Sequence, residues 1–104
     1  MPIDVREVKE SPLVQGVNER VIYSLDVTPW GNNPTSVVVT VLDNTDNDAD
    51  ETASRTTGSP SVVGNIITLP TIYQLEDDHQ YSVFIRFTIG SNIFEVYARI
   101  QANR

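Results

Sequence analysis

The strongest constraint on the fold is an alternating run of side chains near the C-terminus. Residues 82–89 read Ser-Val-Phe-Ile-Arg-Phe-Thr-Ile, and a second alternating run follows over residues 92–100. Alternation with a period of two places successive side chains on opposite faces of a β-strand. Between the runs lies Gly90-Ser91, and glycine at the first position of a two-residue turn favours a type II′ hairpin. We therefore predict an antiparallel hairpin that turns at Gly90-Ser91.

The turn also predicts the register of this hairpin, with Ile89 opposite Asn92. The cross-strand pairs of the apolar face are then Phe87–Phe94, Ile85–Val96, Val83–Ala98 and Tyr81–Ile100. The pairs of the other face are Arg86–Glu95, Phe84–Tyr97 and Ser82–Arg99. Opposite-charge and aromatic cross-strand pairs each contribute about 0.2–1 kcal/mol. A shift by two residues would keep the faces but lose the charge pair, so we prefer the register given.

A polar corner, Leu75-Glu76-Asp77-Asp78-His79-Gln80-Tyr81, precedes the hairpin. Its ends are a leucine, which can anchor the corner in the core, and a tyrosine that opens the strand. A buried tyrosine usually finds a hydrogen-bond partner for its hydroxyl. We predict a structural role for both Leu75 and Tyr81, with the Tyr81 ring buried and its hydroxyl bonded to backbone upstream.

The remaining chain reads as short strands separated by turn signals. We predict an edge strand at 4–10, strands at 18–27 and 36–42, a short strand within 52–57, and a hairpin or a single kinked strand within 62–69. No segment has a sustained helical period of apolar residues. At 104 residues the chain has the length of one domain. We predict a single all-β domain, 1–104, built as an antiparallel sandwich of about seven strands.

Two resemblances extend this interpretation. The corner Leu75–Tyr81 and the strand after it resemble the tyrosine corner of immunoglobulin-like and fibronectin type III domains, which implies an immunoglobulin-like β-sandwich. The segments 26–31 (Asp-Val-Thr-Pro-Trp-Gly), 58–60 (Gly-Ser-Pro) and 87–97 are similar to small proteins of tailed-phage and prophage structural modules. That second resemblance implies a virion or assembly role and supplies no catalytic residues.

Composition excludes several classes of function. The chain has 7 lysine and arginine residues against 14 aspartate and glutamate residues, a net charge of −7. Nucleic acid and anionic membrane surfaces are therefore poor partners, because both need clustered basic side chains. There are no cysteines, so disulfides and thiolate metal sites are excluded. The N-terminus lacks the pattern of a signal peptide, which agrees with folding in the cytoplasm of a bacterial host, as the resemblance to phage modules implies.

One acidic segment, 43–51, has the residue types of a metal site. Asp46, Asp48 and Asp50 are spaced at alternate positions, as oxygen ligands of calcium often are. The segment fails as an EF-hand loop because its sixth and twelfth positions are Glu51 and Thr57. We predict a solvated acidic connection and keep a weak calcium site as the alternative.

Little else suggests catalysis or a cofactor. The single histidine, His79, has acidic neighbours, and we expect it to be an exposed turn residue. No acidic residue is embedded in an apolar run that would raise its pKa. Glycines are scattered singly, without a phosphate-binding loop. The sequence therefore favours a protein that is not an enzyme.

Aromatic residues supply the candidates for recognition. Trp30 lies in a proline- and glycine-rich loop, where it either closes one end of the sandwich, which we favour, or serves as an exposed anchor. Phe84 and Tyr97, beside Arg86, point away from the predicted core and resemble the centre of a protein contact. We expect a structural or interaction domain that binds a protein partner or its own copies. The alternative is a ligand-binding module for carbohydrate or calcium.

Overall fold

The structure, a computed structural model, describes residues 5–7 and 13–104, and the side chains of 13–104. The described residues form eleven strands, one 3-10 turn and one short α-helix. The elements are β1 (Val5–Glu7), β2 (Leu13–Gly16), β3 (Ser24–Asp26), β4 (Thr35–Asp43), η1 (Asn44–Asp46), β5 (Ala49–Asp50), α1 (Thr52–Arg55), β6 (Thr56–Thr57), β7 (Ser61–Val63), β8 (Ile66–Thr68), β9 (Thr71–Ile72), β10 (Gln80–Ile89) and β11 (Asn92–Asn103). The prediction of an all-β chain is confirmed.

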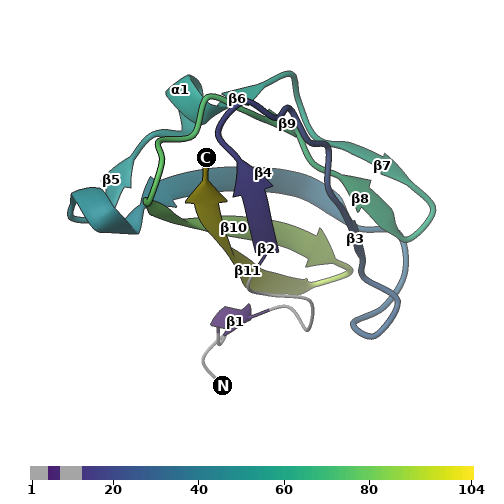
Figure 1. The fold of residues 1–104 in the computed structure, drawn as a ribbon. Coiled ribbons are helices and arrows are strands. Elements are labelled where there is room, and N and C mark those ends of the chain that lie inside the picture. Colours follow the sequence, from purple (N-terminus) through teal and green to yellow (C-terminus); the bar gives the residue numbers. More distant parts are fainter. Residues whose placement is uncertain (1–4, 8–12) are drawn as a thin grey trace.

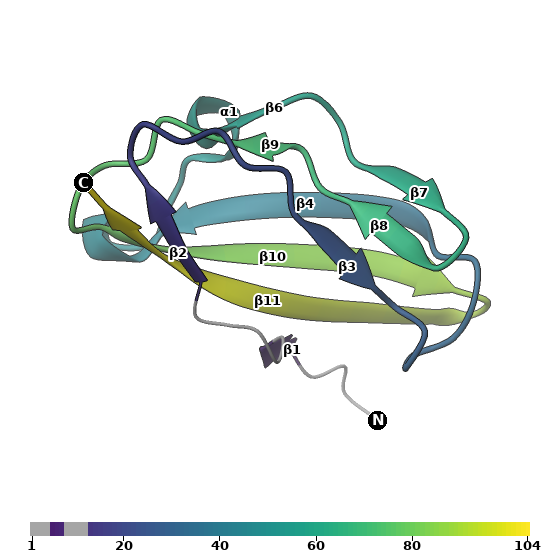
Figure 2. The ribbon, with the colours of Figure 1, turned by 45° about the vertical axis from the view of Figure 1, so that its right-hand side comes forward.

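The strands form two layers (Figures 1 and 2). The larger layer is a six-stranded sheet in the order β1-β11-β10-β4-β5, with β2 also paired to β11. The smaller layer contains the three-stranded sheet β3-β8-β7, and the two-stranded sheet β6-β9 lies beyond it at one end (Figure 2). A bridge between Val21 and Ile72 joins the chain before β3 to β9.

The predicted C-terminal hairpin is confirmed in every pair. Ile89 lies opposite Asn92, Phe87 opposite Phe94, and Phe84 opposite Tyr97. Gly90 has a φ of 61°, the left-handed region that the first position of this turn requires and that glycine adopts without a steric penalty. The inward face of β10 is buried along its length, at Tyr81, Val83, Ile85 and Phe87.

The core lies between the two layers. Its larger-sheet side comes from β4, β10 and β11, and its other side comes from the smaller layer and the chain around β9. The buried side chains are Val27, Val41, Ile67, Leu69, Ile72, Leu75, Tyr81, Val83, Ile85, Phe87, Val96, Ile100 and Ala102. Burying branched aliphatic and aromatic side chains of this kind contributes roughly 1.5–3 kcal/mol each before entropy is subtracted.

The expectation of a wholly antiparallel sandwich is wrong at one edge. Both β1 and β2 run parallel to β11, at its middle and at its C-terminal end respectively. Parallel neighbours need a long connection, and here nearly the whole domain separates the paired segments. Local sequence carries no signal of a pairing between the two ends of a chain. Of the predicted edge strand 4–10, only residues 5–7 lie among the described residues.

Several short elements also differ from the prediction. The strand expected over 18–27 is regular only in β3, and the segment expected to be a short strand, 52–57, forms α1 before the two residues of β6. The segment predicted at 62–69 as a hairpin or a single kinked strand is a hairpin of β7 and β8, with Ser61 opposite Thr68 and Val63 opposite Ile66. The sequence left that choice open, and Gly64, at a φ of 59°, accounts for the turn.

Candidate functional site

The outer face of the six-stranded sheet carries the predicted aromatic pair. The rings of Phe84 and Tyr97 are tilted to each other with centroids 5.6 Å apart, and both side chains are half-buried. Val38 and Ile93 lie on the same face, opposite Arg86 and Thr88, and are 44% and 46% exposed. The aromatic pair therefore shares the outer face with two apolar side chains that are open to solvent.

The charged residues of this face are arranged differently from the expectation. Arg86 is exposed and lies opposite Glu95 in the ladder, as the register requires. No ion pair within 4.0 Å joins them among the described side chains. The charge pair thus identified the register without forming an ion pair, and Arg86 is exposed on the same face as the aromatic pair.

Trp30 closes one end of the sandwich, the alternative favoured by the sequence. Its ring meets Phe87 edge-on with centroids 5.9 Å apart, and it packs against the buried core. The side chain is half-buried. Next to it, a Cβ at position 31 would approach Ile89 to 2.9 Å, so glycine is needed for the loop to close. An indole that packs edge-on against the core exposes less ring surface to a ligand than an indole in an open loop would.

The opposite end is polar and is organised by Tyr81. Its ring is fully buried, and its hydroxyl oxygen accepts the backbone N–H of Glu76 at 2.9 Å. Burial raises the pKa of Tyr81. Leu75 is buried just before the corner. The predicted bond from the tyrosine hydroxyl to upstream backbone is thus present.

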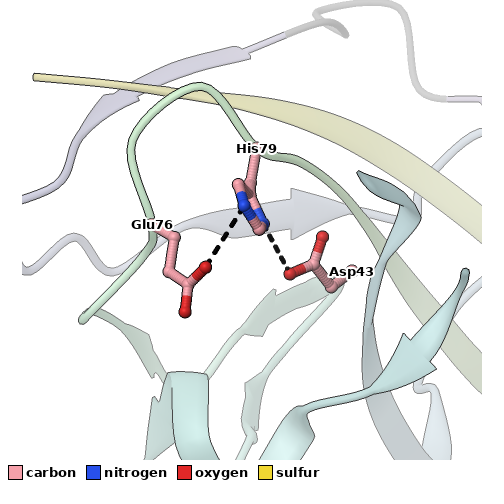
Figure 3. A group of neighbouring side chains, drawn as sticks. All are labelled: Asp43, Glu76 and His79. Carbon is pink, nitrogen blue, oxygen red and sulfur yellow. Dashed lines mark hydrogen bonds and ion pairs between the residues drawn. The ribbon is translucent and has the colours of Figure 1, made fainter. Parts of the chain in front are cut away.

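The expectation that His79 is an exposed turn residue is wrong. Its side chain is 24% exposed and lies between two carboxylates (Figure 3). Nδ1 lies 2.8 Å from Oδ2 of Asp43, and Nε2 lies 3.2 Å from Oε2 of Glu76. Both ring nitrogens can donate at once only in the protonated imidazolium. The geometry therefore suits a positively charged His79.

The electrostatics of the corner agree with this protonation state. The hydrogen bond to Asp43 raises the pKa of His79 above its ordinary value of 6.5, and the charges of Asp43, Glu76 and Glu51 raise it further, against a smaller opposing effect of desolvation. The ring also stacks on Tyr81, with centroids 6.3 Å apart. His79 therefore ties the corner to the end of β4.

Asp43 is the buried member of the group, with a side chain 1% exposed. Its Oδ1 accepts the backbone N–H groups of Thr45 and Asp46 and so caps the 3-10 turn η1. The turn is held against β10 by Ser82, whose hydroxyl donates to Asn44, and by Gln80, whose N–H donates to Thr45. An aspartate at an N-cap with an acidic residue three positions later is a recognisable start signal. The sequence contained this signal, which the acidic composition of 43–51 obscured.

Arg55 extends the polar corner from α1. Its guanidinium pairs with Glu51 at 2.7 Å and with Glu76 at 3.3 Å, donates to the backbone oxygen of Gln74, and lies 5.9 Å from the centroid of the Tyr81 ring. The acidic groups around His79 are thus partly neutralised by one arginine that the sequence did not single out. A local charge pattern favours the pair of Arg55 with Glu51, four residues away, but it does not predict the contact with Glu76, 21 residues away.

The three predicted calcium ligands do not form one site. Asp48 accepts a hydrogen bond from Asn44, and Asp50 accepts two from Thr52, which lower its pKa. Asp46 instead lies near Asp43 and Glu51, where one oxygen of each falls within 4.8 Å of the others.

A second group with that spacing is Asp43, Glu76 and His79. The two carboxylates approach opposite nitrogens of the ring (Figure 3), which satisfies an imidazolium without an ion.

No protein-family model matches the chain, and comparisons with the curated proteins and with the solved structures find no match either. No helix among the described residues is long and apolar enough to cross a membrane.

Proposed function

We propose that the chain is a non-catalytic structural or protein-interaction domain with an immunoglobulin-like sandwich fold. Support for the fold comes from strand order. The order β11-β10-β4 in one layer and β3-β8-β7 in the other corresponds to strands G-F-C and B-E-D of that sandwich. The hydrogen bond from Glu76 to Tyr81 corresponds to its tyrosine corner. The first strands differ, because β1 and β2 pair with β11.

The single observation that carries the function is the outer face of the six-stranded sheet. Phe84 and Tyr97 contact each other on this face, which also carries the exposed Val38 and Ile93, and Arg86 is the next residue of β10 on the same face. Aromatic and arginine side chains are enriched at the centres of protein interfaces. The expected mechanism is rigid display of this face to a protein partner or to further copies of the chain.

The polar corner supports a role without catalysis. A general base needs a free nitrogen within reach of a substrate proton, and both nitrogens of His79 lie against carboxylate oxygens. The side chains of the corner instead connect β4, α1 and the start of β10, and this role is structural. The resemblance of segments 26–31, 58–60 and 87–97 to tailed-phage modules supports a partner within a virion or its assembly, after folding in the host cytoplasm.

The experiment replaces both aromatic residues of the face, Phe84→Ala with Tyr97→Ala, and follows assembly in the cells that make the protein. The sedimentation of the full chain in extracts reports assembly, and urea unfolding of the purified chain reports folding. We expect loss of assembly with stability largely retained. Ile22→Ala, at an exposed apolar position away from this face, is the matched control. Equal loss of folding and assembly would refute the contact face.

A second candidate, cation binding, is favoured by the approach of Asp43, Asp46 and Glu51. Carboxylate oxygens are the ligands that calcium prefers. Calorimetric titration with calcium decides this candidate: heat that disappears in Asp46→Asn supports it, and a flat trace at millimolar calcium removes it.

A further inference from the structure

We propose that the open edge of β4 pairs with the same edge of a second copy, which joins the two larger sheets into one continuous sheet. This surface consists of backbone groups along one side of the sandwich. It shares Val38 with the outer face proposed above, so the backbone amide of Val39 is the group that distinguishes the two proposals.

The edge is open because only one side of β4 is paired along its whole length with another strand. β10 pairs with it from Thr35 to Asp43, whereas β5 pairs only with Leu42 and Asp43. Beyond that point the chain leaves the sheet to form α1. In Figure 2, β4 is the last of the three long strands of its layer, after β11 and β10.

The direction of the free backbone groups follows from Val41. Its N–H donates to the hydroxyl of Thr52, and its carbonyl accepts the N–H of Glu51, so both groups face away from β10. Outward and inward pairs alternate along an antiparallel strand. The N–H and C=O of Val39 therefore face the open edge, and no residue in the described part of the chain bonds to them there.

The two side edges of the sandwich differ in whether another strand covers them. On one side the edge of β11 is covered by β1 and β2. The buried Gln15 of β2 fixes that cover by donating to the carbonyl of Ile72 at 2.8 Å. On the other side β7 ends its layer, and β4 has no neighbour beyond it except where β5 pairs with Leu42 and Asp43. The uncovered side thus offers the longest unpaired strand among the described residues.

The residues of this edge fit a second copy of the chain. Contact across a two-fold axis brings a surface against itself, so a charge there would face its own like charge. Residues 35–42 contain no charged side chain in a chain with a net charge of −7. Open edges are usually protected by charge, proline or a bulge. Here a register shift with Ser36 at a φ of 54° affects only the start of β4.

The exposed side chains on that side are apolar as well. Val38 is 44% exposed on β4, and Val63 is 77% exposed on β7. Pairing along β4 would cover part of this apolar surface and would place two copies of the outer aromatic face in one extended sheet. A strand from a different protein could use the same hydrogen bonds, and the experiment separates that case.

The test is light scattering with size-exclusion chromatography of the full chain over a wide range of concentrations. We expect twice the chain mass at high concentration. Val39→Pro removes one outward N–H and leaves the pairs with β10 intact, and Val38→Lys places a charge near its own copy. Each should raise the dimer dissociation constant at least about tenfold, whereas Ile22→Lys, an equal charge change at another exposed position, should not.

Circular dichroism identifies any variant that fails to fold, and amide exchange provides a readout without substitution. The amide of Val39 should become protected as the concentration of the unmodified chain rises. A chain that stays monomeric, or a dimer without protection at Val39, would overturn the proposal. A dimer lost only in the double variant Phe84→Ala, Tyr97→Ala would place self-association on the outer face instead.

Discussion

Two aromatic pairs lie on opposite faces of the same hairpin and differ in burial. Phe87 and Phe94 face inward with ring centroids 5.8 Å apart, and Phe84 and Tyr97 face outward at 5.6 Å. Both pairs are tilted by nearly the same angle and lie directly opposite in the same ladder. Only the inner pair is covered by the second layer and by Trp30. Ring geometry is therefore set by the strands, and burial is set by what lies above them.

The largest expected difference between the two faces is in stability. Phe87→Ala should lower the free energy of unfolding by about 3–5 kcal/mol, because a fully buried ring leaves a cavity. Urea unfolding of the purified variant measures this loss. A loss below about 1 kcal/mol would show that the second layer does not close over this face as described.

A smaller loss is expected at the polar end of the inner face. Tyr81→Phe keeps the buried ring but removes the acceptor for the N–H of Glu76, and the cost of a lost partner is about 1–3 kcal/mol. Urea unfolding reports the loss, and amide exchange at Glu76 should become faster. Unchanged exchange there would contradict the role of the hydroxyl in fixing the corner.

The outer pair should matter less for folding. Phe84→Ala should cost about 1 kcal/mol or less, the size of a cross-strand pair contribution on a half-exposed face. The measurement is the same urea titration, run beside Phe87→Ala. Equal losses for the two substitutions would remove the distinction between the faces.

The smallest effect concerns the pH dependence of stability. The folded protein raises the pKa of His79 above its unfolded value near 6.5. The contribution of the imidazolium is therefore fully present below pH 6.5 and is lost as the pH rises through the raised pKa. Unfolding titrations on both sides of that interval should show lower stability at the higher pH, and His79→Gln should flatten this part of the profile. An identical profile in the variant would contradict the ion pairs with Asp43 and Glu76.

The sequence predicted what depends on local pattern. The hairpin register follows from Gly90-Ser91 and the alternation around it, and the hydroxyl bond of Tyr81 follows from the corner before its strand. The position of Trp30 followed from its size, since a lone large ring in a small domain usually packs. Each of these features can be predicted from residues close together in the sequence, or from a hairpin register that the turn defines.

What the sequence did not predict depends on distant pairing. His79 meets Asp43, which is 36 residues away, through the fold alone. The parallel pairing of β2 with β11 joins the two ends of the chain. The acidic composition of 43–51 indicated a solvated connection, although Asp43 is buried and caps η1. In each case tertiary contact decides the outcome where composition or local pattern points elsewhere.

The central proposal is that the outer aromatic pair contacts another protein. It is tested most directly by a cross-linking probe placed at one of the two aromatic positions. A benzophenone amino acid in place of Phe84, in the cells that make the protein, reacts with any protein held against the face. We predict a covalent adduct from position 84, and little from the same probe at Ile66, on the outer side of the smaller layer. No adduct at 84, or equal yields at the two positions, would contradict the account.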